Sequence, residues 1–349
     1  MDNKKSSKIS LDKFKNLTDT SLLLTITIVV FFLMYISAMI FLGKGFLKPQ
    51  TFCNILFDNA SLIVLSVGMS IVMIAGGIDI SVGAVAGLVS MCCAVYLEKQ
   101  NGNLIVSFII ALGIGLLFGI VQGYLVAYLN IQPFIVTLAG MFFARGMTTI
   151  VNAEPFNIEN AKAFIDLKNI EIALPFIGSY NKRGDFNNAT ISVGVVVALL
   201  VVAVFFCILK WTKLGRSFYA VGGNAQSALM LGINVKQTKF LSHLLCGLLA
   251  GIGGYVYFMY SGKGSPDAAA TGAEMNAIAS SIIGGTMLTG GVGNIIGTLF
   301  GVLSLSTIQL IVASAGFDEA WWTGITVAVM LCIFLVVQSI VLARKKNEN

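Results

Sequence analysis

Charged residues are scarce in this chain of 349 residues: Asp, Glu, Lys and Arg make up only 11%, against about 25% in a typical soluble domain. Proline is rare as well, with 5 residues. Because 57% of the residues are hydrophobic, the composition excludes an ordinary soluble protein. Alternating segments of about ten residues, which a transmembrane barrel would need, are absent. The composition therefore predicts an all-α polytopic membrane protein.

Motifs for catalysis are missing too. The sequence contains no GxxxxGK[ST] nucleotide-binding loop, and its one histidine cannot build an HExxH metal site or a conventional serine triad. The 6 cysteines lack the paired spacing of metal ligands and indicate no disulfide framework. We expect no catalytic residue, no metal and no cofactor in this chain.

Long apolar segments indicate ten membrane crossings, at about twenty residues each. Ten crossings return the C-terminus to the side of the N-terminus, and both tails are basic, so by the positive-inside rule we expect both in the cytoplasm. The net charge of +6 thus reflects the cytoplasmic side of the chain rather than nucleic-acid binding. We expect membrane lipid as a partner and no nucleic acid. The predicted helices are 20–43, 58–76, 80–97, 104–129, 132–151, 190–210, 239–261, 275–290, 294–314 and 320–342. The predicted regions are basic tails 1–19 and 344–349, a transmembrane domain 20–343, an external loop 152–189 and a cytoplasmic loop 211–238.

Glycine spacing indicates two related halves. Gly76-Gly77, followed by Ser81 and Gly83, has the same spacing as Gly284-Gly285, followed by Thr289 and Gly291. Each copy precedes a run of glycines at four-residue intervals, which predicts close helix packing. Adjacent glycines with a hydroxyl residue at membrane depth also fit a broken helix beside a polar cavity. The two runs are Gly115, Gly119 and Gly123, and Gly293, Gly297 and Gly301.

The segment Lys213–Val235 is a cationic connection with unusual local order. Asn224 is a good helix N-cap residue, and Gly232 stands where a left-handed residue would end a short helix over Ala225–Leu231. Such a helix is about 10 Å long, which is more order than a connection needs. We expect a cytoplasmic partner to bind it.

Charges at membrane depth are few, and each costs about 2.5–3.5 kcal/mol on insertion scales. Asp79 either caps the helix that starts near Ser81 or serves the solute, and Arg145 either snorkels to the surface or is functional. These charges are too sparse to favour an ion-coupled transporter, whereas hydroxyl and amide side chains favour a path for a neutral polar solute. The candidate pathway residues are Asn54, Asn59, Asp79, Ser81, Phe134, Thr137, Glu274 and Thr286.

Four ordered motifs resemble one family: GGIDISVGAVAGL, IQPFIVTLAGMFFARG, LGRSFYAVGGNAQSALMLGINV and AIASSIIGGTMLTGGVGNIIGTLFGVL. From about Cys53 to Trp322 the chain resembles the membrane permease of ribose-, xylose- and galactose-type ABC sugar importers, a type II importer fold. FCNILFDNA, MFFARG and Trp321-Trp322-Thr323 look most like the galactofuranose importer subgroup.

The resemblance implies alternating access driven by a separate cytoplasmic ATPase that binds ATP and Mg²⁺. It also implies an extracytoplasmic sugar-binding protein and a second permease subunit, either another copy or a related chain. It assigns ATPase coupling to Leu214, Gly215, Arg216, Ala220, Gly222, Gly223, Asn224, Ala228 and Gly232, so Ala228→Glu is expected to uncouple transport. Related loops often carry proline or acidic residues where Ala225, Gln226 and Ser227 stand here. Nucleosides, autoinducer-type furanoses and branched amino acids remain alternative solutes.

Overall fold

The structure is a computed structural model that describes residues 19–41, 43–180, 186–266, 269–316 and 320–346. Its helices are α2 (Asp19–Phe41), α3 (Pro49–Asp58), α4 (Ala60–Ile74), α5 (Val82–Lys99), α6 (Leu104–Ala127), α7 (Pro133–Val151), α8 (Lys162–Lys168), α9 (Val193–Trp211), α10 (Lys213–Gly223), α11 (Ala225–Met230), α12 (Val235–Ser261), α13 (Ala273–Ile283), α14 (Ile295–Ser314) and α15 (Ala320–Lys346), with a 3-10 turn at Gly43–Gly45. Strands β1 (Phe156–Asn157) and β4 (Lys263–Gly264) pair antiparallel, as do β2 (Glu171–Tyr180) and β3 (Phe186–Ser192).

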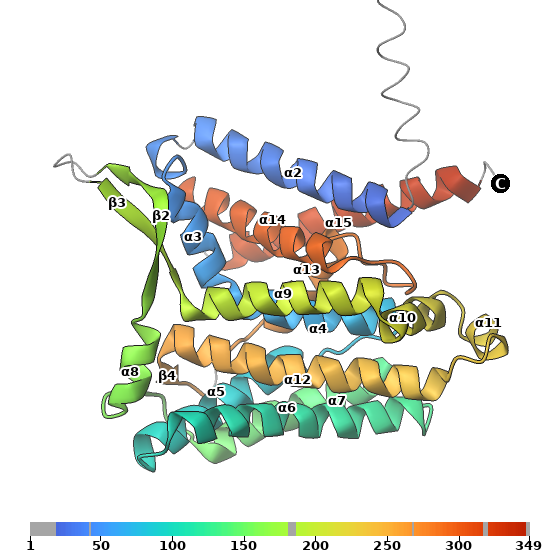
Figure 1. Cartoon of the computed structure of the whole chain (residues 1–349), viewed down its shortest axis with the longest axis horizontal. Coiled ribbons are helices and arrows are strands. Elements are labelled where there is room, and N and C mark those ends of the chain that lie inside the picture. Colours follow the sequence, from blue (N-terminus) through green and yellow to red (C-terminus); the bar gives the residue numbers. More distant parts are fainter. Residues whose placement is uncertain (1–18, 42, 181–185, 267–268, 317–319, 347–349) are drawn as a thin grey trace, which may run out of the picture.

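Within the described residues, seven helices are long and apolar enough to cross a membrane, and α3 with α4 makes an eighth span bent by 57°. The all-α polytopic membrane fold is thus confirmed. The strands, which the sequence did not reveal, lie at one end of the bundle and cap it rather than enter it (Figure 1).

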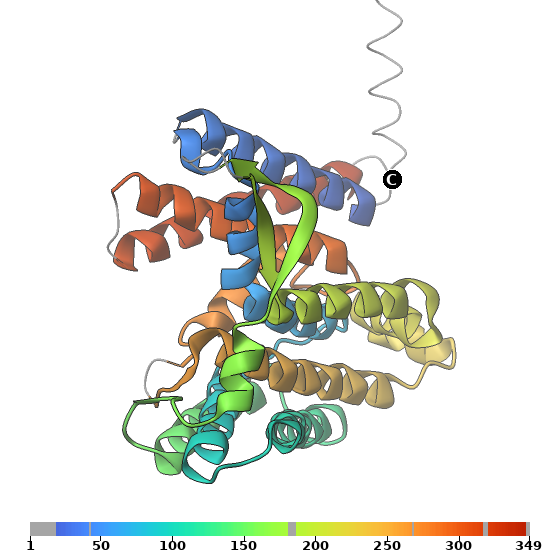
Figure 2. The same ribbon diagram turned by 60° about the vertical axis from the view of Figure 1, so that its left-hand side comes forward.

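The bundle is built around α4, whose residues from Ile63 to Ile74 are all buried. On one side α12 packs against α4, α5 and α6, and α7 packs on α5; on the other, α13 and α14 pack against α4, with α2 and α15 outside them. We call α5, α6, α7 and α12 the first group, and α2, α13, α14 and α15 the second group. Figure 2 shows the two groups apart, the second above and the first below. The groups do not follow the order of the sequence, because α12 belongs with α5 and α6.

Five of the six four-spaced glycines make the helix contacts that their spacing predicts; Gly293 lies before α14, which begins at Ile295, and faces the Ile74 side chain instead. A Cβ at Gly115 would lie 2.3 Å from the carbonyl oxygen of Gly247 in α12, and one at Gly301 would lie 2.0 Å from that of Ser280 in α13. A Cβ at Gly119 or Gly123 would lie 3.0 or 2.9 Å from carbonyl oxygens of α12, and one at Gly297 would lie 2.1 Å from the carbonyl oxygen of Gly284, at the end of α13. Glycine therefore sets the distance between α6 and α12 and between α13 and α14.

The predicted eighth crossing at 275–290 is wrong in its bounds. Helix α13 has 11 residues, about 16 Å at 1.5 Å per residue, which cannot span a hydrocarbon core of about 30 Å. It ends because Gly285 takes a left-handed conformation with φ +88°. The predicted second crossing at 58–76 is shorter than expected for a related reason, since α4 ends at Ile74 and Gly76 has φ +83°.

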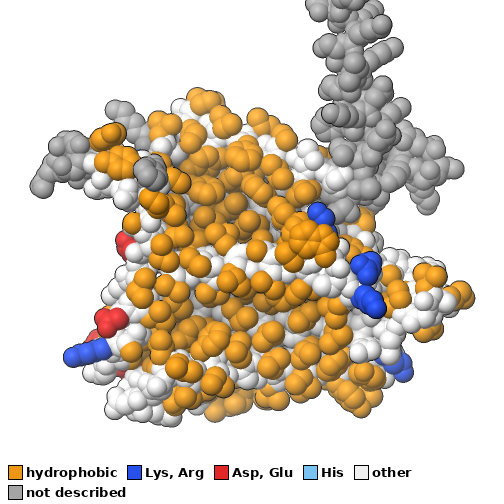
Figure 3. Space-filling model, viewed as in Figure 1, with side chains coloured by type: hydrophobic (Ala, Val, Ile, Leu, Met, Phe, Trp, Pro, Cys, Tyr) orange, Lys and Arg blue, Asp and Glu red, His pale blue; other side chains and the backbone are white. Residues whose placement is uncertain are grey.

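The two ends of the bundle differ in character. The start of α2, the end of α15 and the α10–α11 segment all lie at one end, and the β2–β3 hairpin and α8 lie at the other (Figure 1). On the face in Figure 3 a broad hydrophobic belt separates Lys and Arg residues near α10 from the visible Asp and Glu residues at the hairpin end. The two ends of the helical bundle therefore lie on opposite sides of this hydrophobic belt. Of the predicted basic tails, residues 1–18 and 347–349 fall outside the described residues.

Candidate functional site: the α10–α11 segment and the turns beneath it

Helix α11 forms as its sequence predicts. The side-chain oxygen of Asn224 accepts a hydrogen bond from the Ser227 amide at 2.9 Å, and Gly232 has φ +81°. The helix runs over Ala225–Met230, one residue shorter than expected. The preceding residues are not a loop, since Lys213–Gly223 form α10, which Thr212 caps by accepting from the Gly215 amide. Thr212, a favourable N-cap residue, is the sequence signal for this helix.

The exposed tip of α11 is apolar. Leu229, Met230 and Leu231 are 62%, 86% and 79% exposed at this end of the bundle. Ala228 is only 1% exposed and faces inward. Glu at position 228 would therefore disrupt the segment itself, so the Ala228→Glu substitution is not a clean test of binding. The surface available to a partner is the Leu229–Leu231 tip.

The end of α10 approaches two turns of the bundle closely at a glycine, Gly222. A Cβ at Gly222 would lie 1.8 Å from the Ile74 carbonyl oxygen and 2.6 Å from the Gly291 nitrogen. One at Gly290 would lie 2.9 Å from the Cα of Gly76. The Gly291 amide also donates to the Ile74 carbonyl at 2.9 Å. We call Gly76, Gly222, Gly290 and Gly291 the glycine junction; it joins the end of α4, the end of α10 and the turn before α14.

The turn that ends α4 at the junction matches the turn that ends α13. The Gly76 amide bonds to the Met73 carbonyl and the Gly77 amide to that of Val72, and after α13 the amides of Gly285 and Thr286 bond to the carbonyls of Ile282 and Ser281 in the same spacing. Each turn is thus a Schellman-type helix end on a left-handed glycine. The internal echo is real, but the sequence alignment was one residue off, because Gly76 corresponds to Gly285 rather than to Gly284.

Tyr219 adds a side-chain contact between α10 and the turn before α14. Its hydroxyl donates to the Gly293 carbonyl at 2.9 Å. Burial raises the pKa of Tyr219 to about 12, so the hydroxyl keeps its proton at neutral pH. Among the predicted coupling residues, Gly215 and Ala228 are buried, whereas Arg216, Gly223, Asn224 and Gly232 are exposed. Leu214, Ala220 and Gly222 are partly buried.

Two predicted pathway residues, Asp79 and Ser81, form a buried turn. One carboxylate oxygen of Asp79 accepts from the Ser81 amide at 3.0 Å and from its hydroxyl at 2.6 Å. Gln122 of α6 donates to the Ser81 hydroxyl at 2.9 Å. The N-cap of α5 is Ser81, so Asp79 orders the turn that leads into the helix rather than capping the helix itself.

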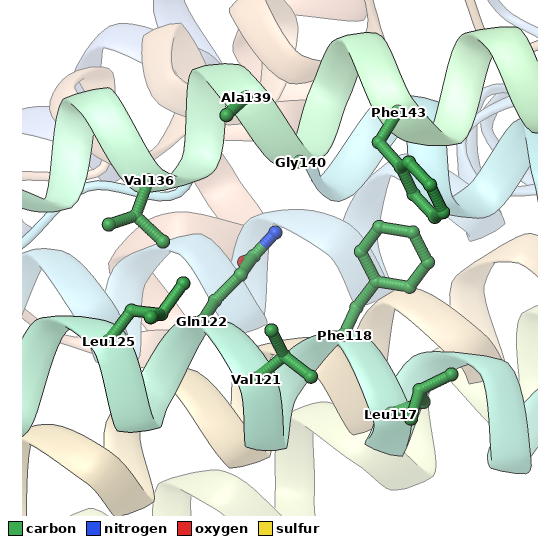
Figure 4. A pocket seen from close by; sticks show the side chains of 9 residues that line it. All are labelled: Leu117, Phe118, Val121, Gln122, Leu125, Val136, Ala139, Gly140 and Phe143. Carbon is green, nitrogen blue, oxygen red and sulfur yellow. The ribbon is translucent and has the colours of Figure 1, made fainter.

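Gln122 also borders a groove between α6 and α7. The groove has a volume of about 540 Å³. Figure 4 shows Gln122 reaching toward Gly140 with apolar side chains around it. A Cβ at Gly140 would lie 2.2 Å from the Gln122 amide nitrogen, so the glycine makes room for this side chain. The remaining lining is Leu117, Phe118, Val121, Leu125, Val136, Ala139 and Phe143. A lining so apolar suits lipid or another helix better than a sugar.

The other predicted pathway residues do not converge in the described part of the chain. Asn54 on α3 is exposed, and its side-chain oxygen accepts from Gln50, while Asn59 donates to the Ile55 carbonyl. Phe134 is half exposed at the start of α7. Thr137 and Thr286 are fully buried. Their role in translocation stays a prediction.

Arg145 and Glu274 are brought together. The guanidinium of Arg145 on α7 lies 3.5 Å from a carboxylate oxygen of Glu274 on α13, and the Arg145 side chain is 25% exposed. Arg145 therefore does not snorkel alone to the surface. This contact could not be predicted from the sequence, because the two residues are 129 positions apart and their spacing indicates no contact.

Known proteins similar to this chain are membrane permeases. The model of the family described as branched-chain amino acid transport system, permease component, matches residues 51–334. The chain belongs to this permease family. It is 36% identical to the inner membrane ABC transporter permease protein YjfF of Escherichia coli K12, over 90% of this chain and 91% of that protein. It is 33% identical to the fructose import permease protein FruG of Bifidobacterium longum, over 90% of each chain.

A ribose import permease, RbsC of Escherichia coli K12, is 32% identical over 84% of this chain and 88% of its own length. No solved structure matches the chain. The expected resemblance to ABC sugar-importer permeases is thus confirmed at the level of the family, and the chain is a transport component. The galactofuranose subgroup stays a prediction.

Proposed function

We propose that this chain is the permease subunit of an ATP-driven, binding-protein-dependent importer, and that it forms part of the path of a monosaccharide across the bacterial inner membrane. The observation that carries the proposal is the α10–α11 segment: α11 is a capped helix with an exposed apolar tip, and α10 packs closely on two turns of the bundle. Its relatives include permeases that import ribose and fructose.

Energy enters through a partner in this proposal. The sequence has no nucleotide-binding loop, so ATP and Mg²⁺ belong to a cytoplasmic ATPase that binds the Leu229–Leu231 tip. The end of the bundle with α10 and α11 then faces the cytoplasm, together with both ends of the chain. The hairpin end faces outward and meets an extracytoplasmic sugar-binding protein. A second permease subunit completes the path.

Alternating access follows from movement of the two helix groups about α4. The ATPase moves α10, and α10 contacts both turns at the glycine junction, so one displacement reaches α4 and the start of α14 together. The moving units are the packed groups rather than the two halves of the sequence, because α12 is packed among α4, α5 and α6.

The decisive experiment is reconstituted uptake. The chain is purified with its ATPase and second permease, placed in proteoliposomes, and given its binding protein and labelled sugar. ATP-dependent uptake that requires the binding protein is the expected result. Uptake by the chain alone down an ion gradient would instead show a secondary transporter, the competing class.

The solute is tested on the binding protein, where specificity of such importers is expected to lie. We expect a furanose or pentose to bind, with galactofuranose first and ribose second. One relative is an autoinducer 2 import permease of Yersinia pseudotuberculosis, 30% identical over 84% of this chain. Binding of a nucleoside, an autoinducer-type furanose or a branched amino acid in place of a sugar would redirect the assignment within the family.

A further inference from the structure

Arg145 contacts three groups in the short stretch that leads into α13. Its guanidinium donates to the Ala269 carbonyl at 2.5 Å and to the Ala270 carbonyl at 3.3 Å, and it lies 3.5 Å from the Glu274 carboxylate. We call these four residues the Arg145 clamp. A planar guanidinium suits this task because its donors point in several fixed directions, which a lysine ammonium cannot reproduce.

Helix α5 is shaped to receive the same stretch. A Cβ at Gly83 would lie 2.1 Å from the Glu274 carboxylate, and one at Gly87 would lie 2.9 Å from the Ala269 carbonyl oxygen. A Cβ at Gly87 would also lie 3.4 Å from a guanidinium nitrogen of Arg145. The two glycines stand one helical turn apart, so a single face of α5 carries the contact.

The clamped backbone is not helical. Ala270 has φ +50°, a left-handed conformation that costs an L-residue about 1–2 kcal/mol, and Gly272 has φ +79°. Helix α13 begins only at Ala273. Carbonyl groups outside a helix need partners at membrane depth, and Arg145 supplies them for Ala269 and Ala270. Strain of this kind persists only where surrounding contacts hold it.

The clamp lies where the two helix groups meet. Arg145 and the two glycines belong to α7 and α5 of the first group, and Glu274 belongs to α13 of the second. Apart from contacts through α4, the packing of α5 against α13 is the most extensive direct contact between the groups among the described residues. A movement of one group relative to the other must change these contacts.

We infer that Arg145 is a positioning residue for transport: with Glu274 it holds the start of α13 against α5 and so stabilises the arrangement of helix groups seen here against the alternate arrangement of the cycle. This inference rests on the proposed function. A ligand or partner shifts such an equilibrium only by its differential contacts with the two states. The Arg145 clamp is such a differential contact, because it is formed in the arrangement of helix groups seen here.

The test uses the complete transporter in proteoliposomes and compares Arg145→Lys, Arg145→Gln, Glu274→Gln and the double Arg145→Gln/Glu274→Gln. Two rates are measured: ATP hydrolysis without the binding protein, and ATP hydrolysis with the sugar-loaded binding protein. Lys263→Gln removes an exposed cation from strand β4 in the same connection and serves as the matched control. Thermal unfolding of each purified complex reports stability separately.

We expect each clamp variant to raise the rate of ATP hydrolysis without the binding protein about three- to tenfold. This corresponds to a change of about tenfold or less in the equilibrium constant between the two arrangements of the helix groups. The double variant should resemble Arg145→Gln, because both lose the contacts of the guanidinium with Ala269, Ala270 and Glu274. Arg145→Lys should show the effect even though its charge remains, because the paired carbonyl bonds are lost. Lys263→Gln should match the wild type.

An unchanged ratio of the two rates in all clamp variants would overturn the inference. So would variants that lose stability and both rates in proportion, since that is the signature of a purely structural contact. If Arg145→Gln does not assemble, Arg145→Lys and the double variant, which leave no buried charge unpaired, still decide the question. Failure of the wild-type complex to couple ATP hydrolysis to uptake would contradict the proposed function instead, and the two failures are therefore distinguishable.

Discussion

At the residue scale, the adjacent glycines at the end of α10 have opposite surroundings. Gly222 is pressed against the Ile74 carbonyl and the Gly291 amide, whereas a Cβ at Gly223 would meet nothing within 4 Å. Both are glycines at one helix end, so sequence alone treats them alike. Only the neighbours from distant parts of the chain separate their roles.

Replacing Gly222 by Ala is expected to push α10 away from the two turns, at a cost of about 1–3 kcal/mol for overpacking. Sugar uptake in proteoliposomes should fall strongly while the ATPase still co-purifies. Gly223→Ala makes the same chemical change and should keep normal uptake. Equal uptake by both variants would contradict a role of the junction in transmission.

The hydroxyl of Tyr219 offers a gentler test of the same contact. Tyr219→Phe removes the bond to the Gly293 carbonyl, and a net loss of about 0.5–1.5 kcal/mol is expected. Ser217→Ala is the control, because the Ser217 hydroxyl donates to the Lys213 carbonyl within α10 itself. The coupling ratio of uptake to ATP hydrolysis should decrease for Tyr219→Phe and stay constant for Ser217→Ala.

At the element scale, α11 combines a predictable helix with an unpredictable orientation. Its cap and its end follow from Asn224 and Gly232, which act locally. Which face is buried depends on how α10 and α12 hold it, so Ala228 could not be placed inward from its sequence. The tip Leu229–Leu231 is the face left for a partner.

Met230→Glu is expected to prevent the ATPase from binding, because it puts a charge into an apolar contact at the most exposed residue of the tip. Co-purification of the ATPase should decrease about tenfold or more, a loss of at least 1.4 kcal/mol. Membrane insertion of the permease should not change. Full co-purification of the ATPase with this variant would exclude the tip as its binding surface.

Asn224→Ala tests the helix rather than its contact. Loss of the cap should cost α11 about 1 kcal/mol. Coupling should weaken less than with Met230→Glu, because the tip side chains remain. Hydrogen exchange of the α11 amides in the purified chain measures the loosening directly, and unchanged protection would show that neighbouring contacts hold α11 without its cap.

At the scale of the whole molecule, the packing defines two helix groups around α4 that the order of the sequence conceals. Spin labels at Phe143 on α7 and Ile333 on α15, both exposed, sit in different groups, whereas Ile109 on α6 and Ile150 on α7 share one. In the complete transporter the first pair should change distance when ATP is trapped, and the second pair should not. Pulsed electron-spin measurements on variants without Cys207 and Cys332 provide the distances, and a constant first distance would contradict group movement.

Much of the fold was predictable because it depends on local or periodic signals. Apolar length located most crossings, and the four-spaced glycines marked the contacts of α6 with α12 and of α13 with α14. The bounds of α13 were wrong because hydropathy cannot distinguish a full crossing from a half helix followed by an apolar, glycine-rich turn. The pathway residues were chosen by polarity, and polarity does not reveal that Asp79 and Ser81 bond to each other.

The sequence by itself determined that this is a multi-pass membrane protein of an ABC importer permease family, with a capped helix between two of its spans. Those properties depend on composition, short-range capping and ordered motifs, each contained within a few dozen residues. The tertiary structure decided that Gly222 meets Ile74 and Gly291, that Ala228 faces inward, and that Arg145 holds Glu274. These contacts join residues far apart in the chain, and only the packing of the helices brings them together.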